Sequence, residues 1–176
     1  SEQGWIDQCI PHCLCRFWGD VTAMIRDNDL KSCEGTNCYF SGTAAEKINL
    51  KLVEELLKEK NDAQYGLPIQ FGRDEVKHGG LLNATKETCL TIVNQTHPED
   101  YFKYCIILRK QGNKVWFQCF YYGQSVLTGK KHQEQERANS LSGMLLNALS
   151  HVNEMDYDAE YQYYHDFENM VKDVFV

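Results

Sequence analysis

The stretch Tyr101–Tyr122, YFKYCIILRKQGNKVWFQCFYY, decides the fold. Its two halves are rich in β-branched and aromatic residues and are joined through Gln111-Gly112-Asn113, a pattern that predicts a β-hairpin. If Gly112-Asn113 is a two-residue turn, Gln111 opposes Lys114 and every later pair follows from that register. One face of the hairpin then carries a continuous apolar set: Tyr104, Ile106, Leu108, Val115, Phe117, Cys119 and Tyr121. A register shifted by one residue mixes apolar and polar side chains on each face, so we favour the first.

The same register predicts where the hairpin cysteines point. Cys105 and Cys119 fall on opposite faces of the sheet, so they are not expected to pair with each other. The segment Thr88–Val93 is rich in β-branched residues and predicts a neighbouring strand. One hairpin cysteine is therefore expected to bond Cys89 on that strand or a cysteine nearer the N-terminus.

The cysteine content indicates an oxidising compartment. The chain has eight cysteines, all within its first 119 residues: Cys9, Cys13, Cys15, Cys33, Cys38, Cys89, Cys105 and Cys119. Two N-glycosylation sequons, at Asn83 and Asn94, lie on either side of Cys89. The chain also begins at Ser1 without an initiator Met, as a mature chain does after signal-peptide removal. We expect a secreted, disulfide-bonded glycoprotein.

A zinc site is the alternative reading of the first cysteines. Cys9, His12, Cys13 and Cys15 bring thiolates and an imidazole close together, and the Cys33–Cys38 pair would be the only second knuckle. That reading leaves the later cysteines without a role, so we favour disulfides.

Helices are expected on both sides of the sheet segments. Apolar spacing predicts a helix from Pro11 to about Asp27. A capping box at Thr43-Ala44-Ala45-Glu46 predicts the start of a second helix that ends near residues 60–62. Two further apolar stripes predict helices near the C-terminus. The first stripe is Leu141, Leu145, Ala148 and Val152. The second is Ala159, Tyr163, Phe167, Met170 and Val174, and this last helix is expected to dock on the sheet.

Two segments are predicted to be mainly loop. Residues 28–42 read as a loop cross-linked by Cys33 and Cys38, and residues 65–80 as a loop with at most an edge strand. The predicted fold is therefore α+β: a small antiparallel sheet of three or four strands, packed with N-terminal and C-terminal helices and stapled by disulfides. We expect one domain over residues 1–176, with a cross-linked part at 1–122 and an acidic helical part at 123–176.

Charge and motifs exclude several classes of function. The net charge is −7, and residues 153–176 hold seven acidic groups against Lys172 alone, so nucleic acid is not an expected partner. No apolar run approaches the roughly 20 residues of a membrane span. Glycine-rich phosphate loops are absent from the sequence, and we expect no cofactor.

Possible metal and catalytic residues are sparse. His151/Glu154 and His165/Glu168 each place two ligand types three residues apart on a helix. On one continuous helix the two pairs would lie about 21 Å apart, too far to share an ion, so we expect no metal. The run Arg73-Asp74-Glu75 with His78 offers an acid and a base, but no Ser or Cys nucleophile motif accompanies them and a charged, solvated loop is the favoured reading.

We therefore expect a non-catalytic secreted protein that binds an extracellular or cell-surface protein. Tyr157, Tyr161 and Tyr164, set among acidic residues, are the expected partner surface. A carrier of a small apolar ligand is the second hypothesis, since aromatic residues make up 12% of the chain. An extracellular hydrolase with an unrecognised site is the third.

Overall fold

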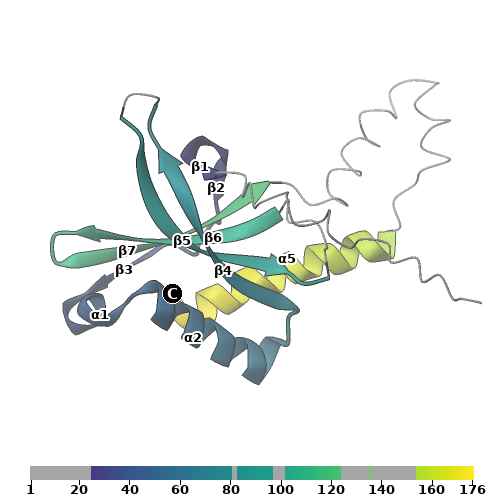
Figure 1. The fold of residues 1–176 in the computed structure, drawn as a ribbon. Helices are drawn as coiled ribbons and strands as arrows, with labels where there is room; N and C mark the ends of the chain where they lie inside the picture. The colour runs from purple at the N-terminus through teal and green to yellow at the C-terminus, as the bar shows by residue number, and fades with distance from the viewer. Residues whose placement is uncertain (1–24, 81–82, 97–101, 124–134, 136–153) are drawn as a thin grey trace, which may run out of the picture.

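The predicted hairpin forms the middle of the sheet. Figure 1 shows the computed structural model, in which the described residues are 25–80, 83–96, 102–123, 135 and 154–176. Strand β6 (Phe102–Gln111) pairs with β7 (Lys114–Gly123) from Gln111 opposite Lys114 to Phe102 opposite Gly123. The predicted register is confirmed. Gly112 has φ +62°, a left-handed conformation that a tight hairpin turn requires and that glycine adopts without a steric penalty.

The described sheet has seven strands and curls into a half-barrel. Beside the hairpin lie β5 (Thr85–Asn94) and β4 (Ile69–His78), and the shorter strands are β1 (Ile25–Arg26), β2 (Leu30–Ser32) and β3 (Cys38–Ser41). The order is β1-β4-β5-β6-β7-β2, with β3 also on β7, and β1 is parallel to β4. Strands β1 and β2 are the first and last strands of this order, so they lie at opposite edges of the sheet. Only the turn η1 (Asp27–Asp29) connects them in the chain. A connection this short brings the two edges together.

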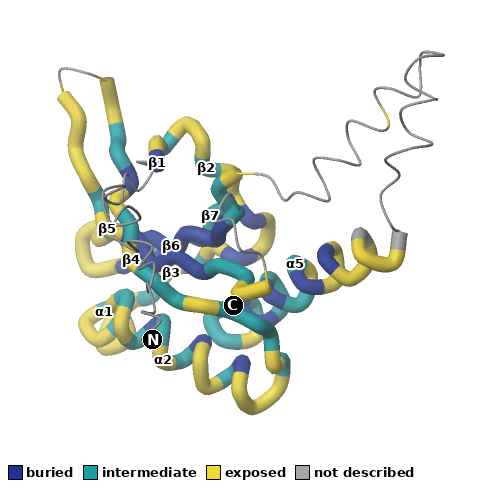
Figure 2. Tube along the Cα trace, turned by 45° about the vertical axis from the view of Figure 1, so that its right-hand side comes forward, coloured by how far each residue is buried: buried dark blue, intermediate teal, exposed yellow. Residues whose placement is uncertain are grey.

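The curl gives the sheet two faces with different neighbours. The helix-covered face carries Leu90, Ile92, Tyr104, Ile106, Phe117 and Cys119, which pack with residues of the helices. The strand-enclosed face carries Val76, Cys89, Cys105 and Ile107, which pack with Ile25 of β1 and Leu30 of β2. Figure 2 shows buried residues gathered along the central strands and on one side of the C-terminal helix. Because strand side chains alternate, the four long strands β4–β7 supply both cores.

Two helices follow β3, and they begin differently from the prediction. Helix α1 (Gly42–Lys47) is capped by Ser41 without a side-chain hydrogen bond, so the predicted capping box at Thr43 is wrong. Helix α2 (Leu50–Lys60) begins afresh, with the Asn49 side chain accepting a hydrogen bond from the Leu52 N–H at 3.0 Å. Because the helix is interrupted between Lys47 and Leu50, the apolar face of α2 is set independently of α1. That face buries Val53 and Leu57. The short π-helical turn η2 (Asn61–Tyr65) extends it.

The C-terminal helix α5 (Glu154–Phe175) docks on the sheet as predicted. The Phe167 ring stacks on the Tyr104 ring with centroids 3.9 Å apart, and Phe175 stacks on Phe117 at 4.6 Å. Met170 and Val171 are buried in the same core. Ala159, at the start of the predicted stripe, is exposed instead.

The predicted sheet of three or four strands is wrong, and so is the loop predicted at 65–80, where the ten-residue strand β4 forms. The loop predicted at 28–42 contains β2 and β3, and the last residues of the first predicted helix form β1 and η1. Strands β1–β3 span only two to four residues, too few to show a period. The rest of the predicted helix from Pro11, and the helix predicted around residues 141–152, fall outside the described residues.

Disulfide stapling is also wrong for the described cysteines, because all five are free thiols: Cys33, Cys38, Cys89, Cys105 and Cys119. Cys105 does lie beside Cys89, as expected, and Cys119 lies beside Cys33, but each pair is joined by a thiol hydrogen bond. That hydrogen bond, followed by burial, raises the pKa of Cys105 and of Cys119 far above the ordinary range. Buried, protonated thiols are poor nucleophiles. Cys9, Cys13 and Cys15, with the alternative zinc cluster, lie outside the described residues.

Every helix in the described parts of the chain is too short or too polar to cross a bilayer.

Candidate ligand-binding pocket

A pocket of about 650 Å³ opens between the first half of α5 and the adjacent ends of β4 and β5. Leu67 and Pro68, just before β4, form one wall together with Asn94 and Thr96 at the end of β5. The opposite wall is helical: Asp156, Ala159, Glu160, Gln162, Tyr163 and Asp166. A volume of this size is within the range of small-molecule sites.

The strand-side wall is held in place by a buried amide. The Asn61 side chain accepts a hydrogen bond from the Leu67 N–H at 2.8 Å and donates one to the Leu67 carbonyl at 3.0 Å. The Gln95 N–H donates to the Pro68 carbonyl at 2.7 Å and so ties this wall to the end of β5. Both backbone groups of Leu67 are therefore satisfied by a single side chain, which fixes the wall before any ligand arrives.

We expect Asn61→Ala to lower the free energy of unfolding by about 2 kcal/mol, because the buried Asn61 amide makes two hydrogen bonds to Leu67. Without it the Leu67 N–H loses its acceptor, and the Leu67 carbonyl keeps only the Ile69 N–H. The measurement is urea unfolding followed by circular dichroism. Asp62→Ala, at the next and exposed position, is the control and should change stability by less than about 0.5 kcal/mol. Equal losses in the two variants would show that the amide does not hold the wall.

The helical wall continues the stripe that docks α5 on the sheet. Positions 156, 159, 160 and 163 follow helical spacing and lead directly into the buried Phe167. Where α5 lies on the sheet this stripe is aromatic and aliphatic, and where it borders the pocket it carries carboxylates. Asp156 and Glu160 interrupt a stripe that is otherwise apolar, and these two acidic residues are the signal in the sequence that could have revealed the pocket.

Glu160 is the most constrained carboxylate of the pocket. Only 6% of the residue is exposed, and its Oε1 accepts a hydrogen bond from the Tyr164 hydroxyl at 2.6 Å. The Tyr164 ring packs on Phe102 with centroids 4.6 Å apart, which positions that hydroxyl. The second oxygen, Oε2, is buried and makes no hydrogen bond to the described residues. A buried carboxylate with half of its hydrogen-bonding capacity unused is costly.

The remaining polar groups of the pocket are neutral or acidic. Burial raises the pKa of the Tyr163 phenol, so its hydroxyl stays protonated and neutral. Asp166 Oδ1 accepts a hydrogen bond from the Gln162 amide at 2.7 Å. Asp156, Glu160 and Asp166 give the described lining three carboxylates and no lysine or arginine. The pocket therefore favours a cation over an anion.

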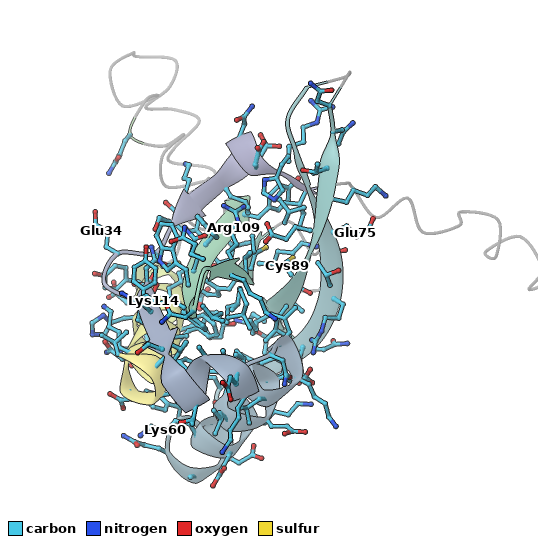
Figure 3. All side chains as sticks on the ribbon, turned by 90° about the vertical axis from the view of Figure 1, so that its left-hand side faces the viewer. Glu34, Lys60, Glu75, Cys89, Arg109 and Lys114 are labelled. Atoms are coloured by element: carbon cyan, nitrogen blue, oxygen red, sulfur yellow. The ribbon has the colours of Figure 1, made fainter. Side chains whose placement is uncertain are left out.

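A second polar cluster lies at one end of the strand-enclosed face. His78 Nε2 lies 2.8 Å from Glu87 Oε2, and its Nδ1 lies 3.4 Å from Asp27 Oδ2. The Arg109 guanidinium donates to Glu87 at 2.9 Å. Figure 3 shows Arg109 and Cys89 toward the inside of the curled sheet and Glu75 on its outer side. The cluster joins η1 to β4, β5 and β6, and its members satisfy one another, which is typical of a structural ion network.

The predicted reading of Asp74 and His78 as residues of a solvated loop is wrong. Both lie on β4, and Asp74 forms a buried ion pair with Lys103 at 2.8 Å. Because His78 belongs to the ion network and Asp74 to this pair, the structure does not bring the two side chains into one acid–base site.

The predicted partner tyrosines have different environments. Tyr161 is 64% exposed on α5, whereas Tyr164 is half-buried and bonded to Glu160. The side chain of Tyr157 lies outside the described residues. Of the two sequons, Asn83 is exposed beside β5, and Asn94 lines the pocket. Its Oδ1 accepts hydrogen bonds from the backbone N–H and hydroxyl of Thr96.

The described residues place no group of three or more His, Cys, Asp or Glu side chains where they could hold a metal ion. His165 is exposed and Glu168 is half-buried on α5. Burial raises the pKa of Glu168. His151 and the side chain of Glu154 lie outside the described residues.

Comparison of the chain with protein-family models, curated proteins and solved structures finds no match in any of the three.

Proposed function

We propose that the chain is a non-catalytic binding protein that holds a small organic molecule in the pocket between α5 and the ends of β4 and β5. The observation that carries this proposal is the pocket itself: about 650 Å³, with a wall fixed by Asn61. Such a site needs little rearrangement to accept a ligand, which lowers the cost of binding. Leu67, Pro68 and the Tyr163 ring offer apolar contact, as a carrier requires.

Filling the pocket tests this function. We expect saturation-transfer NMR to detect binding of at least one of three ring-bearing probes, namely benzylammonium, benzyl alcohol and benzoate. Ala159→Trp should abolish that binding, because Ala159 lines the pocket from an exposed helical position. His165→Trp, also exposed on α5 but outside the lining, is the matched control and should bind as the wild type does. Absence of binding by all three probes, or unchanged binding in Ala159→Trp, would contradict the proposal.

A protein partner is the second candidate. Its support is the exposure of Met155 and Tyr161 on α5, which are among the most exposed large apolar side chains of the described residues. A partner recognised there should be lost on Tyr161→Ala and retained on Ala159→Trp, which separates the two functions.

We also propose that the protein is secreted and glycosylated. The exposed position of Asn83 supports this, because a glycan there can extend into solvent. At Asn94 a glycan would emerge beside the pocket and restrict its opening.

A further inference from the structure

We propose that the molecule held in this pocket is an organic cation, a protonated amine on a small apolar body, and that Glu160 is the residue that binds its charge. The inference rests on the proposed function, since it names the chemical class of the ligand for the same pocket. Four observations carry it.

The first is the half-satisfied carboxylate of Glu160. Oε1 is occupied by the Tyr164 hydroxyl, while Oε2 is buried and without a partner among the described residues. The packing of Tyr164 on Phe102 fixes the position of the Tyr164 hydroxyl. If the Glu160 carboxylate turned over, its two oxygens would change places and one of them would still have no partner. An ammonium group entering the pocket would supply a charge-assisted N–H···O bond to Oε2 and would neutralise the buried charge.

The second is the sign of the surrounding charge. Asp156 and Asp166 line the same pocket, and its described lining contains no basic side chain. Carboxylates held near one another raise the local concentration of cations and repel anions. A single cationic ligand therefore interacts favourably with all three groups, and an anionic ligand with none.

The third is the position of these acids along α5. Carboxylates in the first turn of a helix stabilise its dipole, and this accounts for Asp156 without any ligand. Glu160 lies at the end of the second turn and Asp166 in the fourth, beyond the reach of that effect. Burial of Glu160 on the docking stripe of the helix is unfavourable for folding alone. Its presence there is explained by a ligand that uses it.

The fourth is the neutral part of the lining. Leu67, Pro68 and the buried Tyr163 ring provide apolar contact next to the carboxylate. The protonated Tyr163 hydroxyl adds no opposing charge. This combination fits a charged amine attached to an aliphatic or aromatic body, with the amine at the Glu160 end.

The test compares benzylammonium with benzyl alcohol, its neutral counterpart of similar shape, by saturation-transfer NMR or calorimetry on the full chain. We expect the wild type to bind benzylammonium more tightly than benzyl alcohol and not to bind benzoate. Glu160→Gln keeps the side-chain shape and should weaken benzylammonium binding by about tenfold or more, with little change for benzyl alcohol. The matched control is Asp158→Asn, which removes the same charge from an exposed position outside the pocket lining and should change benzylammonium binding by less than about threefold.

Each outcome decides between the two proposals. Equal binding of the amine and the alcohol, or equal effects of Glu160→Gln and Asp158→Asn, would overturn the cation assignment and leave the binding function standing. No binding by any probe would overturn the binding function itself. If Glu160→Gln does not fold, Asp166→Asn removes a second pocket carboxylate from a half-buried position. It should weaken benzylammonium binding about threefold and leave benzyl alcohol unchanged, and unchanged amine binding would overturn the cation assignment.

Discussion

Replacement of Phe167 by alanine is expected to lower the free energy of unfolding by about 4 kcal/mol. Phe167 is fully buried and stacks on Tyr104 at the centre of the contact between α5 and the sheet. Its removal leaves a cavity on both elements, and the rigid strands around Tyr104 cannot collapse into it. Urea unfolding followed by circular dichroism and tyrosine fluorescence measures the loss.

The control for this prediction is Tyr161→Ala on the same helix. Tyr161 is largely exposed, so its truncation should change stability by less than about 0.5 kcal/mol. A loss below about 1 kcal/mol for Phe167→Ala would show that α5 contributes little to the folded core. Because the same helix forms one wall of the pocket, Phe167→Ala is also expected to abolish probe binding.

Replacement of Lys103 by methionine is expected to cost about 3–5 kcal/mol. Lys103 Nζ lies 2.8 Å from Asp74 Oδ2, and the two side chains are only 9% and 16% exposed. The substitution keeps much of the side-chain volume and leaves Asp74 on the strand-enclosed face without its counter-ion. The double variant Lys103→Met/Asp74→Leu removes both charges and should recover most of the loss, because an apolar pair can replace a buried ion pair.

The matched control is the ion pair between Lys86 and Glu75, which joins β5 to β4 at 2.7 Å with both side chains more than half exposed. Lys86→Met should cost about 0.5 kcal/mol, because solvent screens this pair. If Lys86→Met and Lys103→Met lowered the free energy of unfolding by similar amounts, burial would not be what determines the cost of breaking an ion pair in this protein.

The sequence was informative where local chemistry and the tertiary environment agree. The hairpin was predicted with its register because Gly112-Asn113 fixes the turn and, in that register, Ile106 and Phe117 fall on one continuous apolar face. The last helix was predicted because its stripe from Tyr163 to Val174 keeps helical spacing. The last helix has one face on the core and the other in solvent, which is the situation that periodicity reports. In the hairpin both faces are covered, so the turn rather than polar alternation fixed the register.

Strand β4 was missed because charged side chains on both of its faces form ion pairs with different neighbouring elements. Asp74 and His78 turn toward the strand-enclosed face, where ion pairs satisfy them, and Arg73 pairs with Glu54 of α2 on the other face. Apolar alternation is therefore hidden in the sequence. The pocket was missed for a related reason: Ala159 and Tyr163 have the spacing of core residues, and only the three-dimensional arrangement shows that they also line a pocket.

Within the described residues, the short strand β1 covers only a small part of one edge of β4. Among the described strands, β1 pairs only with Val76 and Lys77 on that side, while β5 pairs with all ten residues of β4 on the other. An uncovered strand offers unpaired N–H and C=O groups on which another molecule can add a strand and start aggregation. The consecutive charges of Arg73, Asp74 and Glu75 occupy this segment, and an added strand would have to bury or face them. The charged residues that make β4 difficult to predict from the sequence are thus the ones that disfavour self-association through its edge.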